Sequence, residues 1–396
     1  MAPPASSLRD IRAATFRANP AYELVLFDRL PAAEQAALAD LQQDPDLYGL
    51  LRPRGPGLSL KSACRETALL FFTLQTPGTL PAYVTTRLGA AGNEAIARLV
   101  LDRILEIESA GTFRSGAEAH RLIYAEPPSA ETGGALARLS LEAVRYGQGL
   151  DLADSARLSA RLYSYNRLPA SPAWKRRLPS ADALAEYLEI HPAGRNRPLL
   201  QTQWRSRPPA PDNPGWHYWV SAHPEAARAG PRSFKLYVSP RGEHLREAFN
   251  ATLEVLTQVR APSFKIGRDL HGVLRPDKLV AYFGSREAVH EAGDRLRRRL
   301  EGMPAQGVPF TAALDAEGLL SWGTDPPRGE HLLAWQGSSW RRWITDRLAV
   351  ALLSAKAAAA TALEPWQFAL DRLRLEGIET TTWTPATTIW DQATEE

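Results

Sequence analysis

Three lysines stand out by their rarity and by where they lie. The 396-residue sequence contains 41 arginines but only six lysines. Lys235, Lys265 and Lys278 nonetheless fall within a window of 44 residues, where an even scatter would place fewer than one. Each belongs to a short segment with apolar residues at alternate positions, which is typical of a β-strand with one apolar face. Neighbouring strands lie about 5 Å apart, so lysines on such strands can converge on one face of a sheet.

Lysine differs from arginine in a property that matters for catalysis. A lysine among other cations in a partly dry site can lose its proton at a useful pH, whereas arginine keeps its proton. Such a lysine is a candidate base, and the remaining cations suit a phosphate group. The same spacing is also typical of solvated charges that protect the edge of a sheet. The residues alone leave both interpretations open.

Other catalytic and metal-binding motifs are absent from the sequence. It contains no G-x-x-x-x-G-K-[ST] loop, no G-x-S-x-G turn and no kinase loop of the H-R-D type. The single cysteine, Cys64, excludes an internal disulfide and a cysteine-based zinc site, and no H-E-x-x-H pair occurs. The chain is therefore not expected to phosphorylate its own substrate, and a zinc site is not supported.

The lysines lie in a region predicted to form a mainly antiparallel sheet with helices packed on it. Alternating polarity predicts a sheet core over 215–323, with helices at 245–259 and 285–300. Helical periodicity predicts further helices over 134–206 before the sheet and over 337–375 after it. These elements indicate an α+β fold.

The N-terminal part is predicted to hold a winged-helix-like domain over 47–125, preceded by a helical arm over 1–46. The prediction depends on the order of elements, three helices followed by a short hairpin. The expected helices and hairpin lie at 62–73, 79–88, 93–104 and 105–115.

A winged helix has three common uses, and the sequence weighs them differently. It can read DNA, bind a peptide as an added strand or serve as a packing module. The third helix sets Arg98 and Arg103 against Glu94 and Asp102, so a basic DNA-reading face is not expected. Peptide binding and packing both stay open.

Length and composition indicate a globular chain with more than one domain. Hydrophobic residues at 44% and charged residues at 23% exclude a disordered or fibrous protein. All eleven tryptophans lie from Trp174 onward, which favours two regions with different cores and a second domain over 126–396. A net charge of only +3 argues against nucleic acid as a partner. No apolar run of membrane-spanning length and no secretory signal is found, so a cytoplasmic protein without a membrane partner is expected.

Residues 235–322 resemble the phosphothreonine lyase fold. That family includes effectors of the OspF and SpvC type, Hop-effector-like lyases and the lyase domains of lanthipeptide synthetases. The synthetases have a W-K-x-H-x-S strand, a helix, an F-K-F strand and then a G-K-F strand. Upstream and downstream, the Hop-like group has an L-Y-x-x-Y segment and an S-F-G-x-H-R segment. The similar segments here are, in chain order, Leu162–Tyr165, Phe234–Ser239, Ser263–Ile266, Asp277–Val280 and Gly337–Arg342.

The resemblance implies β-elimination of phosphate from phosphoserine or phosphothreonine, without a metal or organic cofactor. By position, Lys265 is the base that removes the Cα proton. The histidine acid of the synthetases is replaced by Tyr237, as in the Hop-like group, and the neighbouring lysines are expected to lower the pKa of this tyrosine. The phosphate-binding residues that the resemblance implies are Lys235, Lys278, Arg268 and Arg342.

The leading hypothesis is a lyase that forms dehydroalanine or dehydrobutyrine in a ribosomal precursor peptide, in lanthipeptide-like natural-product biosynthesis. Its expected partners are the phosphorylated precursor peptide, held by the N-terminal module through its leader, and a separate Ser/Thr kinase-like protein. A homodimer is left open. The first alternative is a catalytically inactive scaffold of the same fold that binds the peptide or the kinase. The second is a winged-helix DNA-binding regulator.

Overall fold

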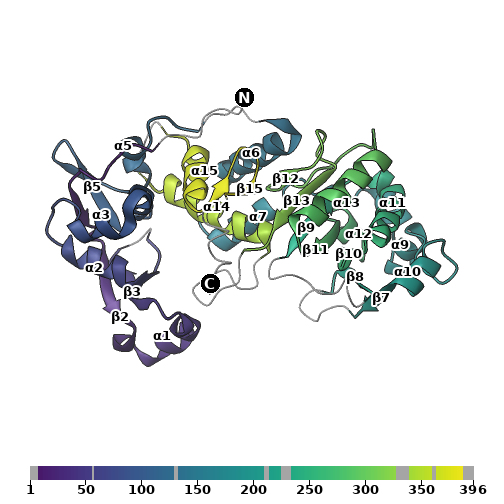
Figure 1. The fold of residues 1–396 in the computed structure, drawn as a ribbon, viewed down its shortest axis with the longest axis horizontal. Coiled ribbons are helices and arrows are strands. Elements are labelled where there is room, and N and C mark those ends of the chain that lie inside the picture. The colour runs from purple at the N-terminus through teal and green to yellow at the C-terminus, as the bar shows by residue number, and fades with distance from the viewer. Residues whose placement is uncertain are drawn as a thin grey trace.

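The molecule is elongated, with the N-terminal and central parts of the chain at opposite ends. Figure 1 shows the N-terminal elements in purple and blue at one end, the C-terminal helices in yellow at the middle, and a large sheet in green at the other end. None of the described helices combines the length and apolar character needed to cross a membrane. The computed structural model describes residues 8–55, 58–128, 133–208, 214–223, 233–326, 339–358 and 363–386.

The first 46 residues contain strands as well as a short helix, so the expectation of a purely helical arm is wrong. Phe16 pairs with Ile107, and Leu24 pairs with Leu51. Strands this short, with partners far along the chain, leave little periodicity in the sequence. The elements of this segment are β1 (Phe16–Ala18), β2 (Tyr22–Leu26) and α1 (Ala32–Ala37).

Three helices and a hairpin follow in the predicted order. The hairpin strands form a three-stranded sheet in the order β1-β5-β6, and a second sheet has the order β2-β3-β4. Gly111 takes the left-handed conformation in the hairpin turn, with φ of 75°. The elements are β3 (Leu47–Pro53), β4 (Lys61–Cys64), α2 (Arg65–Thr73), α3 (Ala82–Leu88), α4 (Gly92–Leu101), β5 (Leu105–Ser109), β6 (Thr112–Arg114) and α5 (His120–Ile123).

The segment predicted to be helical over 134–206 contains five helices and ends at Gln203; residues 204–206 belong instead to strand β7 (Trp204–Arg207). Three of its helices begin at side chains that accept a hydrogen bond from the first turn, namely Asp154, Ser171 and Ser180, which satisfies a free backbone N–H. The helices are α6 (Gly134–Gly149), α7 (Ser155–Tyr163), α8 (Pro172–Arg177), α9 (Ala181–Tyr187) and α10 (Arg197–Gln203).

A seven-stranded sheet carries the lysine segments, in the order β12-β13-β9-β11-β10-β8-β7. Every neighbouring pair is antiparallel, which confirms the predicted α+β class. The strands are β7 (Trp204–Arg207), β8 (Trp216–Ser221), β9 (Phe234–Val238), β10 (Ser263–Gly267), β11 (Leu279–Phe283), β12 (Ala312–Ala313) and β13 (Leu320–Thr324). The helices between them are α11 (Leu245–Gln258), α12 (Leu270–Val273) and α13 (Arg286–Arg299).

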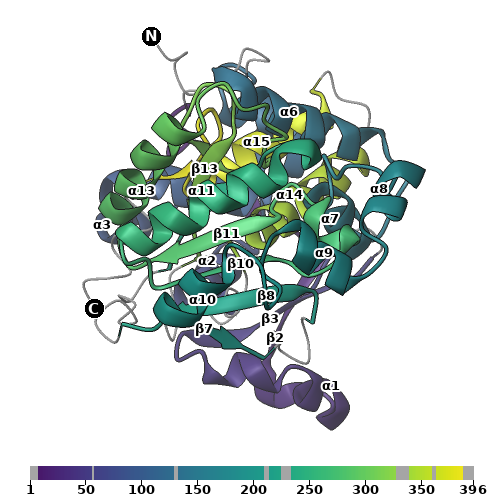
Figure 2. The same ribbon diagram turned by 90° about the vertical axis from the view of Figure 1, so that its right-hand side faces the viewer.

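The two faces of this sheet differ in character. Figure 2 shows α11 and α13 in front of the sheet and α14 (Trp340–Lys356) behind it. Leu236, Phe264 and Ala281 face α11 and α13 in a closed apolar core. Alternation along each strand turns the intervening residues to the other side, where Lys235 and Lys265 lie. This second side is called the lysine face below.

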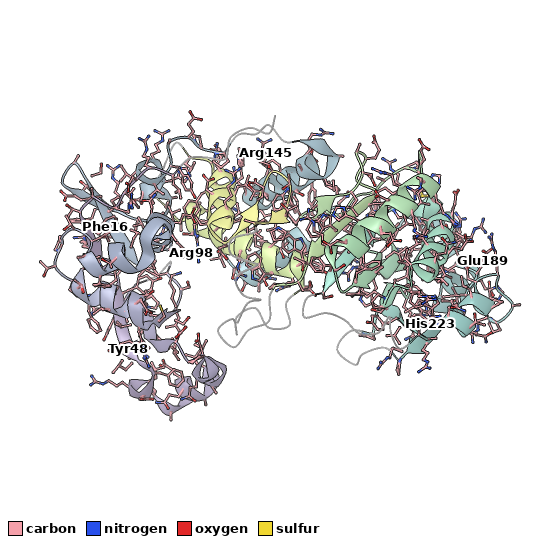
Figure 3. All side chains as sticks on the ribbon, in the orientation of Figure 1. Phe16, Tyr48, Arg98, Arg145, Glu189 and His223 are labelled. Carbon is pink, nitrogen blue, oxygen red and sulfur yellow. The ribbon has the colours of Figure 1, made fainter. Side chains whose placement is uncertain are left out.

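The C-terminal helices pack on the N-terminal part, so the predicted boundary between 125 and 126 does not divide the hydrophobic core. Phe16, Leu105 and Leu348 belong to one buried cluster. Arg98, labelled in Figure 3, donates a hydrogen bond to the carbonyl of Leu375 at the end of α15. The C-terminal elements after α14 are α15 (Pro365–Leu375), β14 (Ile378–Glu379) and β15 (Thr384–Pro385).

Gly267 ends the strand that carries Lys265, and α12 crosses its backbone closely. A Cβ at this position would lie 2.3 Å from the carbonyl carbon of Gly272. Gly267→Ala is therefore expected to lower the free energy of unfolding by about 1–3 kcal/mol, because backbone must move to admit the methyl group. Denaturant unfolding measures the change. Gly149→Ala, where a Cβ meets nothing within 4 Å, is the control, and an equal effect of both changes would contradict the prediction.

Candidate functional site on the lysine face

Strand register brings two of the three lysines and Tyr237 to the same face of the sheet. Val280 lies opposite Tyr237 on one side and opposite Lys265 on the other. Two residues along β11, Tyr282 lies opposite Lys235. Because directly paired residues share a face, all five side chains project from the lysine face. The sequence prediction that strand lysines converge is confirmed for Lys235 and Lys265.

Aromatic rings lie between the two lysines. The Nζ atoms of Lys235 and Lys265 are 5.5 Å and 5.7 Å from the centre of the Tyr282 ring. Lys265 also lies 4.2 Å from the ring centre of Trp216, a geometry that stabilises a cation on an aromatic face. Burial lowers the pKa of Lys265 to about 8, and the charge of Lys235 acts in the same direction. Lys265 therefore has a larger neutral fraction near neutral pH than an ordinary lysine and can act as a base.

Lys235 is held by an ion pair at the start of α14. Its Nζ donates to Oδ1 of Asp325 at 2.5 Å. The same oxygen accepts the backbone N–H of Trp340, the first residue of α14, at 2.9 Å. A carboxylate at a helix N-terminus is favoured by the free N–H groups there. Asp325 thus fixes Lys235 relative to the helix that covers this part of the sheet.

A buried carboxylate, Asp277, gathers two arginines beside the lysines. Arg275 reaches it with Nε and Nη2 at 2.8 Å and 2.9 Å, and Arg341 lies 3.0 Å from it. The Tyr163 hydroxyl donates to the same carboxylate at 3.0 Å. Burial alone would raise the pKa of Asp277, but Arg341 and Arg275 hold it below its usual range. Asp277 is therefore ionised at neutral pH and orients both guanidinium groups.

Trp216 connects this arginine cluster to Lys265. Its ring centre lies 4.9 Å from the guanidinium carbon of Arg275 and 4.2 Å from Nζ of Lys265. The site therefore has more cations than anions, which favours an anionic ligand such as phosphate. The cations are Lys235, Lys265, Arg275 and Arg341, and the anions are Asp277 and Asp325.

Tyr237 lies on the lysine face, but its electrostatics differ from the prediction. It is 4% exposed and packs with Val280 and Val308. Burial raises its pKa well above the ordinary value, and Asp325 acts in the same direction. The expectation that neighbouring lysines lower this pKa is wrong, because desolvation of the phenolate outweighs the attraction of the nearby cation, Arg341. Tyr237 keeps its proton at neutral pH, and its role as the acid stays a prediction.

Lys278 does not join the exposed part of the site. The residue is fully buried, and its Nζ donates to the Pro240 carbonyl at 2.7 Å and to the side chain of Gln306. Burial lowers its pKa to about 7. To bind a phosphate, the side chain would have to leave both acceptors. The predicted phosphate-binding role of Lys278 is therefore untested, while the contacts give it a structural role beneath the sheet end.

Arg268 and Arg342 lie away from the lysine cluster. Arg268 follows the last residue of β10, is exposed, and acts electrostatically on His217. That charge helps to lower the pKa of His217, whose strand partner Ile266 faces the apolar core. Arg342 forms an exposed ion pair with Asp346, one turn along α14. The structure brings neither arginine to the predicted phosphate site.

The arginines that do lie at the site are ones that the sequence reasoning missed. Arg341 is 1% exposed and stacks on the Tyr163 ring at 4.5 Å. A helical pattern could have found it, because Arg341 shares the buried face of α14 with Ile344 and Leu348. Arg275 and Asp277 lie in a loop, where no periodicity marks them. Of the segment 337–342 used for the resemblance, Gly337 and Ser338 lie outside the described residues.

The lysine cluster does not line the cavity described next. A cavity of about 880 Å³ lies instead between the N-terminal part and the C-terminal helices. Among the residues that the structure describes, no three His, Cys, Asp or Glu side chains gather as a metal-ligand set. The residues lining the cavity include Tyr22, Lys61, Arg103, Val350 and Phe368.

Comparison with solved structures finds neighbours of low sequence identity. No family profile and no curated protein matches the sequence. An effector protein from Pseudomonas syringae pv. syringae strain 61 is 12% identical, with a TM-score of 0.41 over 65% of this chain and 99% of the effector. An effector protein from Pseudomonas syringae pv. tomato strain DC3000 is also 12% identical, with a TM-score of 0.38 over 63% of this chain and 98% of that one. Both are too distant to assign an activity.

Proposed function

We propose that the chain is a lyase that eliminates phosphate from phosphorylated Ser or Thr in a precursor peptide, giving dehydroalanine or dehydrobutyrine. The observation that supports this most is the environment of Lys265. It is partly exposed on the lysine face, has a pKa of about 8, and lies beside other cations that attract a phosphate. A base next to an anion site is what elimination of phosphate requires.

In the proposed reaction, neutral Lys265 takes the proton from Cα of the phosphorylated residue. The electron pair of the C–H bond forms the Cα=Cβ double bond, the Cβ–O bond breaks, and its electron pair leaves with the phosphate. Lys235 and Arg275 stabilise the charge on the departing phosphate. The products are a dehydroamino acid in the peptide and inorganic phosphate. No further reactant is needed.

Two tyrosines are candidates for protonating the leaving oxygen. Tyr237 is the position that the family resemblance implies. Tyr282 lies between the two lysines, and burial raises its pKa well above the ordinary value, so it also keeps its proton at neutral pH. Separate Tyr237→Phe and Tyr282→Phe variants distinguish them, because only the acid's loss slows the step that releases phosphate.

We extend the proposal to the N-terminal part and to the partners. The three helices α2, α3 and α4 with the hairpin β5–β6 would act as a winged-helix module that holds the precursor's leader as an added strand. Among the described strands, β6 lies at the edge of its sheet, with no strand paired on its outer side. A separate Ser/Thr kinase-like protein would supply the phosphorylated peptide.

A catalytically inactive scaffold of the same fold is the competing proposal, because Tyr237 is enclosed by apolar side chains. Mass spectrometry of phosphothreonine and phosphoserine peptides incubated with the full chain separates the two. Loss of phosphoric acid from the peptide supports the lyase. Loss of only the phosphoryl group, with water added, means hydrolysis and contradicts it. An unchanged precursor peptide, presented with its leader and after treatment with its kinase, supports the scaffold.

A further inference from the structure

The lysine face continues outward to two arginines on the edge strand β7. Arg207 pairs with Tyr218, which pairs with Lys265. Arg205 pairs with Val220, which pairs with Ser263 in the row that holds Tyr282. Across the sheet, Arg207 is therefore aligned with Lys265, and Arg205 is aligned with Lys235 through Tyr282. Figure 2 shows β7 at the outer edge of the sheet, next to β8.

The neighbouring residue confirms which way these arginines point. Trp204 is 3% exposed and packs edge-on against Phe264, with ring centres 4.7 Å apart, in the core beneath α11. Alternation then turns Arg205 and Arg207 to the lysine face. Both are exposed, and among the described residues neither has an acidic partner. Two exposed guanidinium groups thus stand on the same side of the sheet as the candidate base.

The spacing between the arginines and Lys265 fits a short stretch of peptide. β7 and β10 are separated by one strand, which places Lys265 and Arg207 about 10 Å apart across the sheet. An extended peptide advances about 3.3 Å per residue. A side chain about three residues from the one undergoing elimination therefore reaches the arginines. Tyr218 lies between the two positions, and its hydroxyl bonds to Ser263 at 3.0 Å.

We propose that Arg205 and Arg207 form a second anion-binding subsite, which holds an acidic or phosphorylated side chain of the substrate peptide about three residues from the reacting residue. This subsite rests on the proposed function of the lysine face. Guanidinium groups bind phosphate and carboxylate through paired N–H donors. The protein would then prefer peptides that carry a second anionic residue at this spacing. If the two arginines serve only to protect the edge of the sheet from pairing with another strand, the protein will show no such preference.

Binding to synthetic peptides tests the subsite without requiring turnover. The full chain carrying Lys265→Arg is titrated with labelled peptides that contain one phosphothreonine and, three residues before or after it, phosphothreonine, glutamate or alanine. Arg205→Gln/Arg207→Gln is expected to weaken binding of the anionic peptides roughly tenfold and to leave the alanine peptides unchanged. Stronger loss for the second phosphothreonine than for glutamate identifies phosphate as the preferred group.

The control is Arg297→Gln/Arg298→Gln, an equal change of charge on α13, which covers the other face of the sheet. Equal weakening of all peptides by Arg205→Gln/Arg207→Gln, or no weakening, would overturn the subsite. The two proposals fail separately. If the wild-type chain prefers peptides with the second anion but eliminates no phosphate, the subsite stands and the lyase proposal is wrong. If it eliminates phosphate without this preference, the lyase proposal stands and the subsite is wrong.

Discussion

Lys265→Arg is expected to abolish elimination of phosphate while the protein stays folded and still binds phosphopeptide. Arginine keeps the positive charge on the lysine face but does not release its proton near neutral pH, so the base is lost and the anion site is not. Loss of a positioned base lowers the rate by about 10²- to 10⁴-fold. The rate of phosphate release from a phosphothreonine peptide measures the change. Lys175→Arg, at an exposed position on α8, is the matched control.

The pH dependence gives this prediction a second readout. The neutral amine is the active form, so the rate of the wild-type chain should rise with pH and level off above about 8, the pKa of Lys265. The charge of Lys235 helps to lower that pKa, so Lys235→Met should move the midpoint to higher pH. A rate that does not change with pH, or a Lys265→Arg variant that keeps full activity, would show that another group is the base.

The second large effect is expected at Asp277, because its carboxylate is the shared partner of the buried Arg341 and the partly buried Arg275. Asp277→Ala leaves Arg341, which is 1% exposed, without its counter-ion and removes the acceptor of Arg275 and Tyr163. Breaking a buried ion pair from one side costs about 3–5 kcal/mol. Denaturant unfolding should show a loss of this size. Asp346→Ala removes the partner of Arg342 from a largely exposed ion pair and is expected to change stability by less than about 1 kcal/mol.

The same residue makes the stability depend on pH. The folded-state pKa of Asp277 is held below its usual range, mainly by Arg341 and Arg275 against the effect of burial. Its stabilising contribution is therefore fully present above the unfolded value of about 4 and is lost as pH falls toward the lower folded-state value. Wild-type stability should decline below about pH 4 more steeply than that of Asp277→Ala. Parallel declines would mean that other carboxylates dominate.

Local sequence patterns determined much of the sheet and part of the site. Alternating polarity in Phe234–Val238 and Ser263–Gly267 predicted strands with one polar face, and the register places Lys235 and Lys265 together there. The rarity of lysine in an arginine-rich chain pointed to these two residues and to Lys278, which the structure holds instead against Pro240 and Gln306. These predictions succeeded because strand periodicity depends only on neighbours along the chain.

The tertiary structure decided the rest, because those features depend on contacts between distant segments. Arg275 and Arg341 meet at Asp277 although they lie 66 residues apart in the sequence. Strand β1 finds its partner β5 only in the folded chain, so the first segment was predicted to be helical. The pKa of Tyr237 depends on how deeply the folded chain buries it. Sequence alone specifies which residue types and faces exist, whereas packing decides which faces meet and which groups lose their water.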